Sequence, residues 1–218
     1  MQQQTGNATQ AIDAVALSAW VREFARLIAE NRDHLNELDS ANGDADHGSN
    51  LDRGMAAVLD TLDGEERALP AALLKDVGVT LVDEVGGSSG ALYGTIFLRL
   101  SGAVGGAETV DDALLAQAFR AAADGVAYRG SVKTGDKTMY DALAPAVDAL
   151  DNALRAGRSR RCAWEDAARA AEAGRDGTIQ MQARKGKSSY VGEKSAGSQD
   201  PGATSLALLI RAAASKLD

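Results

Sequence analysis

The sequence is poor in cysteine, proline and aromatic residues, and these scarcities limit which folds and which cellular environments are plausible. Among 218 residues there are one cysteine, three prolines and 4% aromatics. The single cysteine, Cys162, has no partner for an internal disulfide and no histidine near it in the sequence, so we interpret it as structural. Few prolines and abundant alanine favour helices.

Export and membrane signals are also missing. The chain has no apolar run long enough to span a bilayer. Its start, residues 1–5, is polar and has neither a basic nor an apolar segment, so we expect residues 1–10 to be a flexible tail rather than a signal peptide. We therefore expect no membrane partner and a reducing, cytoplasmic setting. The net charge of −8 argues against nucleic acid as the main partner.

One stretch, residues 38–50, concentrates the polar chemistry of the chain. Its polar members, interrupted by glycines, are Asp39, Asp44, Asp46, His47 and Asn50. Carboxylates this close repel one another unless a cation lies among them, and Mg²⁺ and Ca²⁺ prefer oxygen ligands. The carboxylates can converge only if the chain turns, which the dipeptide Asn42-Gly43 favours.

Three other interpretations of the acidic stretch compete with a magnesium site. An EF-hand is excluded because neither Asn42 nor Asp44, taken as its first residue, leads to the required sixth-position glycine and twelfth-position glutamate. A glycine-rich calcium repeat needs many copies, and the chain has one. Any one aspartate, taken alone, is best interpreted as a helix cap. Together they favour Mg²⁺, which completes its shell with water or phosphate, so we expect a phosphate-bearing ligand.

Apolar periodicity predicts a single all-α domain of about eight helices over residues 11–218. The helices are expected at about 11–38, from 49 or 50, from 70, from the glycine-rich stretch 86–94, at 111–127, from 139 to 154, at 164–174 and from 201. Ser49 or Asn50 is expected to cap the second helix, and Ser88 or Ser89 the fourth. Pro145 is expected to kink the sixth helix or to mark an irregular turn.

The glycine-rich and charged motifs fall between the helices rather than on their apolar faces. If consecutive helices are antiparallel, the connections after the first, third, fifth and seventh helices lie at one end. Those connections contain residues 39–50, 86–90, 130–139 and 183–200. The last of these is long, polar and without periodicity, as functional or disordered segments are. The alternation predicts one composite site at one end of the bundle.

Four stretches in order resemble the nucleotide-binding L subunit of dihydroxyacetone kinase. They read LDSANGDADHGSNLDRGM, VGGSSGALYGT, RGSVKTGDKTMYDAL and TIQMQARKGKSSYVGEKSAGSQDPGATS, and they span nearly the whole chain. The resemblance implies an up-and-down helical barrel that holds ADP or ATP at one end through two Mg²⁺ ions. It also implies a phosphotransferase in which no side chain acts as nucleophile, acid or base, so no residue is assigned a catalytic role.

The resemblance assigns site residues position by position. The metal ligands it implies are Asp39, Asp44 and Asp46. The nucleotide contacts it implies are His47, Gly48, Ser49, Asn50, Ser88, Ser89, Gly130, Met139, Lys187, Asp200, Pro201 and Gly202. Lys187 stands where the family is expected to have arginine, and lysine keeps the charge but not the planar fork.

The resemblance also implies partners. Dihydroxyacetone is held on a separate K subunit, and a phosphohistidine-carrying M subunit of a phosphotransferase system recharges the bound ADP. Alternatives are an ATP-dependent kinase for dihydroxyacetone or another small ketose such as erythrulose, and a nucleotide-loaded module that binds a transcription regulator. A homodimer is compatible with each of these.

Overall fold

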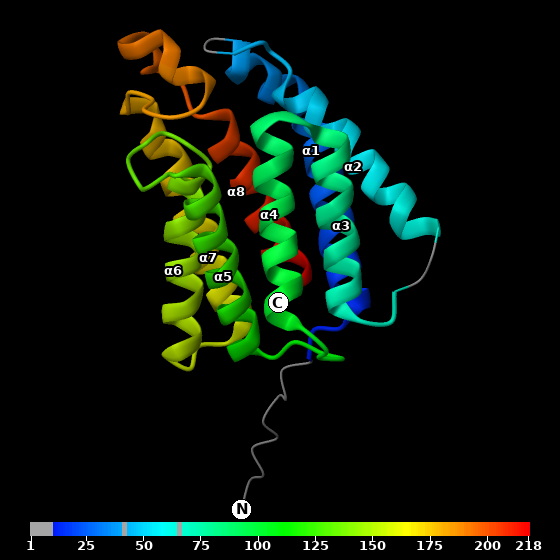
Figure 1. The fold of residues 1–218 in the computed structure, drawn as a ribbon. Coiled ribbons are helices and arrows are strands. Elements are labelled where there is room, and N and C mark those ends of the chain that lie inside the picture. The colour runs from blue at the N-terminus through cyan, green and yellow to red at the C-terminus, as the bar shows by residue number, and fades with distance from the viewer. Residues whose placement is uncertain (1–10, 41–42, 65–66) are drawn as a thin grey trace, which may run out of the picture.

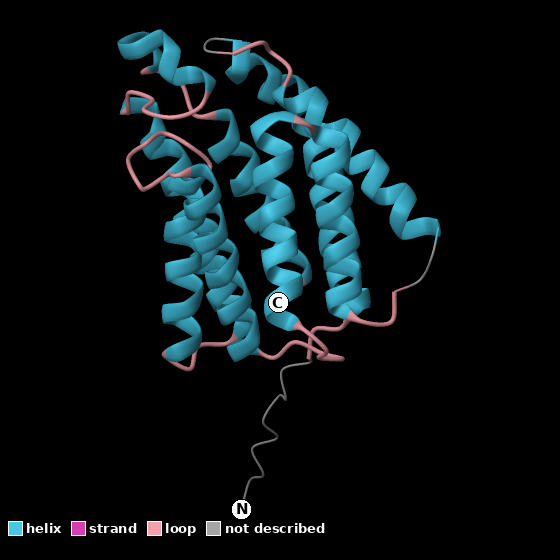
Figure 2. Ribbon diagram, in the orientation of Figure 1, coloured by secondary structure: helices cyan, strands magenta, loops and turns pink. Residues whose placement is uncertain are grey.

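The computed structural model describes residues 11–40, 43–64 and 67–218, and this part of the chain is helical (Figure 2). Its helices are α1 (Ala14–Ser40), α2 (His47–Gly64), α3 (Pro70–Val85), α4 (Gly87–Val104), α5 (Asp112–Gly130), α6 (Tyr140–Arg155), α7 (Arg160–Gly177), two 3₁₀ helices, η1 (Thr178–Gln180) and η2 (Lys187–Ser195), and α8 (Pro201–Lys216). The described residues form no strand, only an isolated β-bridge between Ile12 and Val110. The predicted all-α class is confirmed.

The α-helices form a closed up-and-down barrel (Figure 1). Each α-helix contacts the next along the chain, and α8 contacts α1, which closes the ring. Because the chain reverses at every connection, α1, α3, α5 and α7 end where α2, α4, α6 and α8 begin. We call this the upper end, as it lies in Figure 1, and the opposite one the lower end.

The phenylalanines and tryptophans lie inside the barrel. All five phenylalanines and tryptophans are buried: Trp20, Phe24, Phe97, Phe119 and Trp164. The Trp20 ring lies 5.4 Å from Phe97 and 5.7 Å from Phe119, centroid to centroid. The Trp20 indole N–H donates to the Leu209 carbonyl at 3.1 Å, so this residue also joins α1 to α8. The aromatic cluster thus ties together helices from both ends of the sequence.

Two predicted helix starts are confirmed and two predicted caps are wrong. Pro70 begins α3, and Pro201 begins α8 after the N-cap Asp200. However, α2 begins at His47, so Ser49 and Asn50 lie inside its first turn. Likewise α4 begins at Gly87, so Ser88 and Ser89 follow the cap position, which Gly86 occupies with φ 74° and without a side-chain cap. In each case the helix starts one or more residues before the residue expected to cap it.

Other boundaries differ because local caps and one bridge decide them. The first helix starts at Ala14 rather than near residue 11, since Ile12 pairs with Val110. The seventh starts at Arg160 rather than at residue 164, because the Ser159 hydroxyl accepts the Cys162 N–H. The segment 183–199, expected to lack structure, contains η2.

Pro145 lies inside α6, which continues through it as one helix. A proline cannot donate the backbone hydrogen bond to the carbonyl four residues earlier, here that of Asp141. Gly174 of α7 lies against this carbonyl, and a Cβ at Gly174 would be 2.1 Å from the Asp141 oxygen. The close α6–α7 approach therefore requires a residue without a side chain at 174.

The expected tail, residues 1–10, and Asn42 of the expected turn lie outside the described residues. Within the described part, no helix combines the length and the apolar character needed to cross a membrane.

Candidate functional site

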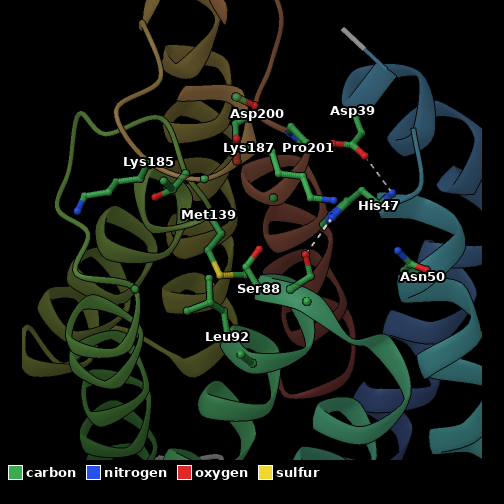
Figure 3. A pocket seen from close by; sticks show the side chains of 18 of the residues that line it. Asp39, His47, Asn50, Ser88, Leu92, Met139, Lys185, Lys187, Asp200 and Pro201 are labelled. Atoms are coloured by element: carbon green, nitrogen blue, oxygen red, sulfur yellow. Dashed lines mark hydrogen bonds between the residues drawn. The ribbon is translucent and has the colours of Figure 1, made fainter. Parts of the chain in front are cut away.

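A pocket of about 560 Å³ opens at the upper end of the barrel (Figure 3). Its lining comes from the connections after α1, α3, α5 and α7 and from the helix starts that follow them. The predicted convergence of these four connections is confirmed. The volume lies within the range of small-molecule sites.

One lip of the pocket is a cluster of three carboxylates from the α1–α2 connection. Asp39, Asp44 and Asp46 each offer an oxygen, and these oxygens lie within 4.8 Å of one another. The Lys187 ammonium from η2 donates to both oxygens of Asp44 at 2.6 Å. This contact holds the pKa of Asp44 below its ordinary value and raises that of Lys187. The Lys187 ammonium therefore offsets part of the negative charge of the cluster. The carboxylate oxygens are also the ligand type that a hard cation prefers.

The two carboxylate oxygens of Asp39 have different roles: one caps α2, and the other belongs to the carboxylate cluster. Its Oδ2 accepts the backbone N–H groups of Asp46 and His47, at 3.1 and 3.3 Å, and so caps α2 from the end of α1. A Cβ at Gly43 would be 2.3 Å from Oδ1, so the chain can turn here only with a glycine. With Oδ2 engaged, Oδ1 remains for a metal ion, and the residues fit Mg²⁺.

The floor of the pocket is formed by the starts of α2, α4 and α8. In α4 the first intrahelical bond is made by the Gly90 N–H to the Gly86 carbonyl, and no side chain caps the turn before it. The N–H groups ahead of Gly90 therefore face the pocket mouth as donors for an anion. Pro201 and Gly202, at the start of α8, complete the floor.

His47 lies buried in this floor and joins two serines. Its Nε2 is 2.9 Å from the Ser205 hydroxyl and its Nδ1 is 3.3 Å from the Ser89 hydroxyl. The Tyr93 hydroxyl donates to the same Ser205 oxygen at 2.7 Å. Burial lowers the pKa of His47, against the opposing effect of Asp39.

The side of the pocket away from the carboxylates is apolar. Leu92 of α4, Val132 and Met139 line it, and Figure 3 shows Leu92 and Met139 next to one another, away from Asp39. At Gly130 a Cβ would touch Val132 at 3.3 Å and Leu92 at 3.5 Å. The pocket thus has one charged half and one half suited to a flat apolar group.

The α5–α6 loop is held in shape by a carboxylate and a buried lysine. Asp141 accepts the backbone N–H groups of Gly135 and Thr138 at 2.5 and 2.8 Å. Lys137, with φ 60° and 1% exposure, donates to the carbonyls of Ser195 and Ser198 at 2.6 and 2.7 Å. Burial lowers the pKa of Lys137. The lysine therefore binds the α5–α6 loop to the segment that carries Lys187.

Asp200 is the most perturbed carboxyl of the site. It caps α8 by accepting the Ala203 N–H at 2.7 Å. Burial, helped by the nearby Asp141, raises its pKa to about 7, while Lys137 and the cap bond act in the opposite direction. Burial thus disfavours the charged form of Asp200 relative to an ordinary, solvated carboxyl.

Most of the site residues expected from the sequence line the pocket. They are Asp39, Asp46, His47, Asn50, Ser88, Ser89, Gly130, Met139, Lys187, Asp200, Pro201 and Gly202. Asp44 lies beside it in the carboxylate cluster. Gly48 and Ser49 instead face α1: a Cβ at Gly48 would be 2.0 Å from the Arg32 carbonyl, and Ser49 bonds to Asn36.

Sequence reasoning predicted Met139 but missed Leu92 and Val132 of the apolar wall, and it missed the two residues that brace the α5–α6 loop. Leu92 follows Ser88 by one helical turn, so the helical period would have placed it on the pocket side of α4. Lys137 and Asp141 gave no signal, because a lysine in a polar loop and an aspartate in a first helical turn are ordinarily solvated.

Comparison with known proteins gives a consistent result. The model of the DAK2 domain matches residues 41–215. The chain is 40% identical to the "PEP-dependent dihydroxyacetone kinase, ADP-binding subunit DhaL" of Escherichia coli, over 88% of this chain and 91% of that protein. It is 39% identical to the "PEP-dependent dihydroxyacetone kinase 1, ADP-binding subunit DhaL" of Listeria innocua, over 88% of this chain and 91% of that protein.

Longer relatives match as well. The chain is 33% identical to the L-erythrulose kinase of Pectobacterium atrosepticum, over 97% of this chain but 37% of that protein. The crystal structure of the dihydroxyacetone kinase of C. freundii superposes with a TM-score of 0.72 at 25% identity, over 99% of this chain and 37% of that one. The same kinase in complex with AMP-PNP and Mg²⁺ gives a TM-score of 0.73 at 26% identity, over 98% of this chain and 36% of that one.

Proposed function

The chain belongs to the DAK2 domain family, and on that premise we propose that it is the ADP-binding subunit of a dihydroxyacetone kinase. It carries a nucleotide in the upper pocket and passes a phosphoryl group to dihydroxyacetone held on a separate K subunit. The single observation that carries the proposal is the division of one pocket into a carboxylate lip, a floor of helix starts and an apolar wall. An adenine nucleotide needs all three.

The carboxylate lip holds the metal. Asp39, Asp44 and Asp46 would bind Mg²⁺, and their three negative charges suit two ions. When bound, the metal neutralises phosphate oxygens and orients the terminal phosphoryl group for in-line transfer. Lys187 leaves Asp44 to the metal and supplies a further positive charge at the phosphates. The three aspartates thus act as metal ligands and Lys187 as a counter-charge, and none of the four acts as a nucleophile.

The remaining groups bind and orient the nucleotide. Backbone N–H groups at the start of α4, beside Ser88 and Ser89, donate to phosphate oxygens. The adenine lies against the apolar wall of Leu92, Val132 and Met139. Phosphates and base are thus held at opposite sides, with the phosphates nearest the carboxylates.

For the phosphoryl donor we propose a phosphohistidine protein that recharges bound ADP in place. This follows the E. coli and L. innocua relatives, which are named PEP-dependent ADP-binding subunits. The matched region covers 91% of each of these two relatives. The erythrulose kinases among the relatives motivate the alternative of free ATP as donor and another ketose as acceptor. In both cases the ketose pocket is on the partner.

A reconstitution assay tests the proposal. The purified chain with ADP and Mg²⁺ is combined with a K subunit and dihydroxyacetone, and either a phosphohistidine donor system or ATP is added. We expect dihydroxyacetone phosphate only when chain and K subunit are both present, and with the phosphohistidine donor. Turnover with ATP alone would select the alternative donor. Nucleotide binding without turnover under either condition would contradict the kinase function and leave a nucleotide-loaded regulatory module.

A further inference from the structure

Beneath the phosphate floor, four side chains form a continuous hydrogen-bonded row. It runs from Tyr93 to Ser205 at 2.7 Å, from Ser205 to His47 at 2.9 Å and from His47 to Ser89 at 3.3 Å. Tyr93 and Ser205 are fully buried, and His47 is 8% exposed. Only Ser89 and His47 line the pocket. The row joins α2, α4 and α8, and Figure 3 shows His47 between Asp39 and the start of α4.

The protons of this row can be arranged in two ways. The Tyr93 O–H donates to Ser205, whose own single proton goes either to the Gly202 carbonyl, at 3.1 Å, or to His47 Nε2. In the first arrangement His47 carries its proton on Nε2, and its Nδ1 accepts the proton of Ser89. In the second, His47 carries its proton on Nδ1 and donates it to the Ser89 oxygen.

The two arrangements differ in what Ser89 offers to the pocket. In the first its proton is directed at His47, so Ser89 presents only lone pairs. In the second its oxygen is already hydrogen-bonded by Nδ1–H, and its proton is free to point into the pocket. A phosphate oxygen accepts hydrogen bonds and donates none, so it is complementary to the second arrangement only.

We propose that the nucleotide complex holds His47 as the Nδ1–H tautomer, in a relay that runs from Ser205 through His47 to Ser89 and ends at a phosphate oxygen. Ser205 is then a positioning residue, since it does not line the pocket. Tyr93 donates to Ser205 in both arrangements, so it does not select between them and lies outside the relay. The proposal rests on the proposed function, because that supplies the phosphate. It adds a role for Ser205, a buried residue on α8 that the pocket lining does not contain.

Nitrogen-15 NMR of the histidine rings tests the proposal directly. The chain has two histidines, and His34 is on the exposed face of α1, so its ring serves as an internal control. The spectra distinguish Nδ1–H, Nε2–H and the doubly protonated ring. With ADP and Mg²⁺ bound we expect His47 as Nδ1–H and His34 unaffected. An Nε2–H or doubly protonated His47 in the complex would overturn the relay.

Variants of the two buried hydroxyls give a second test. Ser205→Ala removes the donor to Nε2, so we expect His47 to lose the Nδ1–H tautomer and ADP to bind about 3- to 10-fold more weakly. Tyr93→Phe keeps the Ser205 donor, so the tautomer is expected to persist and the ADP affinity to stay within about 2-fold. Equal effects of both variants on the tautomer would overturn the relay.

The outcomes separate this inference from the proposed function. If the wild-type chain binds ADP with His47 as Nε2–H, only the relay fails. If it binds no ADP with Mg²⁺, the proposed function and the relay fail together. The wild-type spectrum decides the relay even if Ser205→Ala does not fold, because that spectrum needs no variant.

Discussion

The helix starts at the two ends of the barrel are built differently. At the lower end, Asp13, Asp111 and Ser159 each accept the backbone N–H three residues further on, and Pro70 begins α3. The first three are local caps within each helix's own sequence, whereas α3 begins with a proline and has no side-chain cap. At the upper end α2 is capped across space by Asp39, and the first N–H of α6, that of Tyr140, donates to the Thr138 hydroxyl at 3.2 Å. In the described part of the chain α8 is capped locally by Asp200, and α4 has no side-chain cap.

The difference between the two ends indicates where backbone N–H groups remain available to bind a ligand. At a capped helix start, a side chain accepts a backbone N–H group of the first turn. This bond stabilises the fold and leaves fewer N–H groups for a ligand. The start of α4, where no side chain caps the turn, keeps donors free, and an anion can take the place of the cap. The lower end therefore relies on local caps at α1, α5 and α7, and the upper end keeps donors for phosphate at the start of α4.

Replacing both Asp44 and Asp46 by asparagine is expected to have the largest effect. The change removes two of the proposed metal ligands at positions that are exposed or half-buried, so the fold should survive. We expect the Mg²⁺-dependent affinity for ADP, measured by calorimetry, to fall by about 100-fold or more. Helix content by circular dichroism should stay unchanged.

The matched control for this pair is Asp60→Asn, an exposed aspartate near the lower end of α2. It should leave the ADP affinity as it is. Equal losses in the control and the double variant would mean that net charge, and not the carboxylate cluster, governs binding.

Two glycine-to-alanine changes contrast the ends through the fold itself. At Gly48 a Cβ would lie 2.0 Å from the Arg32 backbone oxygen, so Gly48→Ala should force α2 away from α1. We expect its free energy of unfolding in urea to drop by about 2 kcal/mol or more. At Gly102 of α4 the added Cβ meets nothing within 4 Å, so Gly102→Ala should be neutral or stabilising by up to about 1 kcal/mol. An unchanged free energy of unfolding in Gly48→Ala would contradict this, because it would mean that α1 and α2 can move apart without loss of stability.

Asp200→Asn should change how stability depends on pH. The pKa of Asp200 is raised to about 7 in the fold, above its ordinary value, so the unfolded chain releases this proton at lower pH. The carboxyl therefore costs stability increasingly as the pH rises from about 4 to about 7, and fully above that. Asparagine keeps the oxygen that accepts the Ala203 N–H but does not ionise. We expect a gain of about 1–3 kcal/mol at pH 8 and none at pH 4, by urea unfolding.

The control for this prediction is Asp111→Asn at the lower end. Asp111 is an exposed cap on α5, so asparagine should preserve the cap without a pH-dependent gain. If both variants gained equally between pH 4 and pH 8, burial of Asp200 would not be the cause.

Lys187→Met should have small effects of opposite sign. Without nucleotide, the ammonium competes with a metal for Asp44, so its removal should tighten Mg²⁺ binding by about 2- to 5-fold. With nucleotide, the lost charge should weaken ADP binding. The control for Mg²⁺ binding is Lys185→Met, which removes the same charge from a lysine that also lines the pocket but forms no ion pair with the carboxylates among the described residues. Weaker Mg²⁺ binding in Lys187→Met would contradict the competition.

Patterns local in sequence predicted much of this molecule. Apolar spacing predicted the helices, and the alternation of polar connections predicted one composite pocket at one end. The proline at 70 and the Asp200-Pro201 pair marked helix starts, because their effects act on adjacent backbone. Where the relevant groups are neighbours in the chain, the sequence suffices.

The rest depended on contacts between distant residues. The Asp39 carboxylate caps a helix eight residues on, which moved the start of α2 before Ser49. The Lys137 side chain is buried only because two carbonyls of a remote segment receive it. Gly48 was expected at the ligand and instead faces the Arg32 carbonyl, an approach that no local pattern encodes.

The most direct test of the upper pocket is native mass spectrometry of the purified chain, before and after desalting with a chelator. We expect ADP to be retained together with Mg²⁺, and both to be lost on chelation and in the Asp44→Asn, Asp46→Asn double variant. A chain that retains no nucleotide under any condition, even with ADP and Mg²⁺ added, would contradict a nucleotide site at the upper end and leave the carboxylates as helix caps.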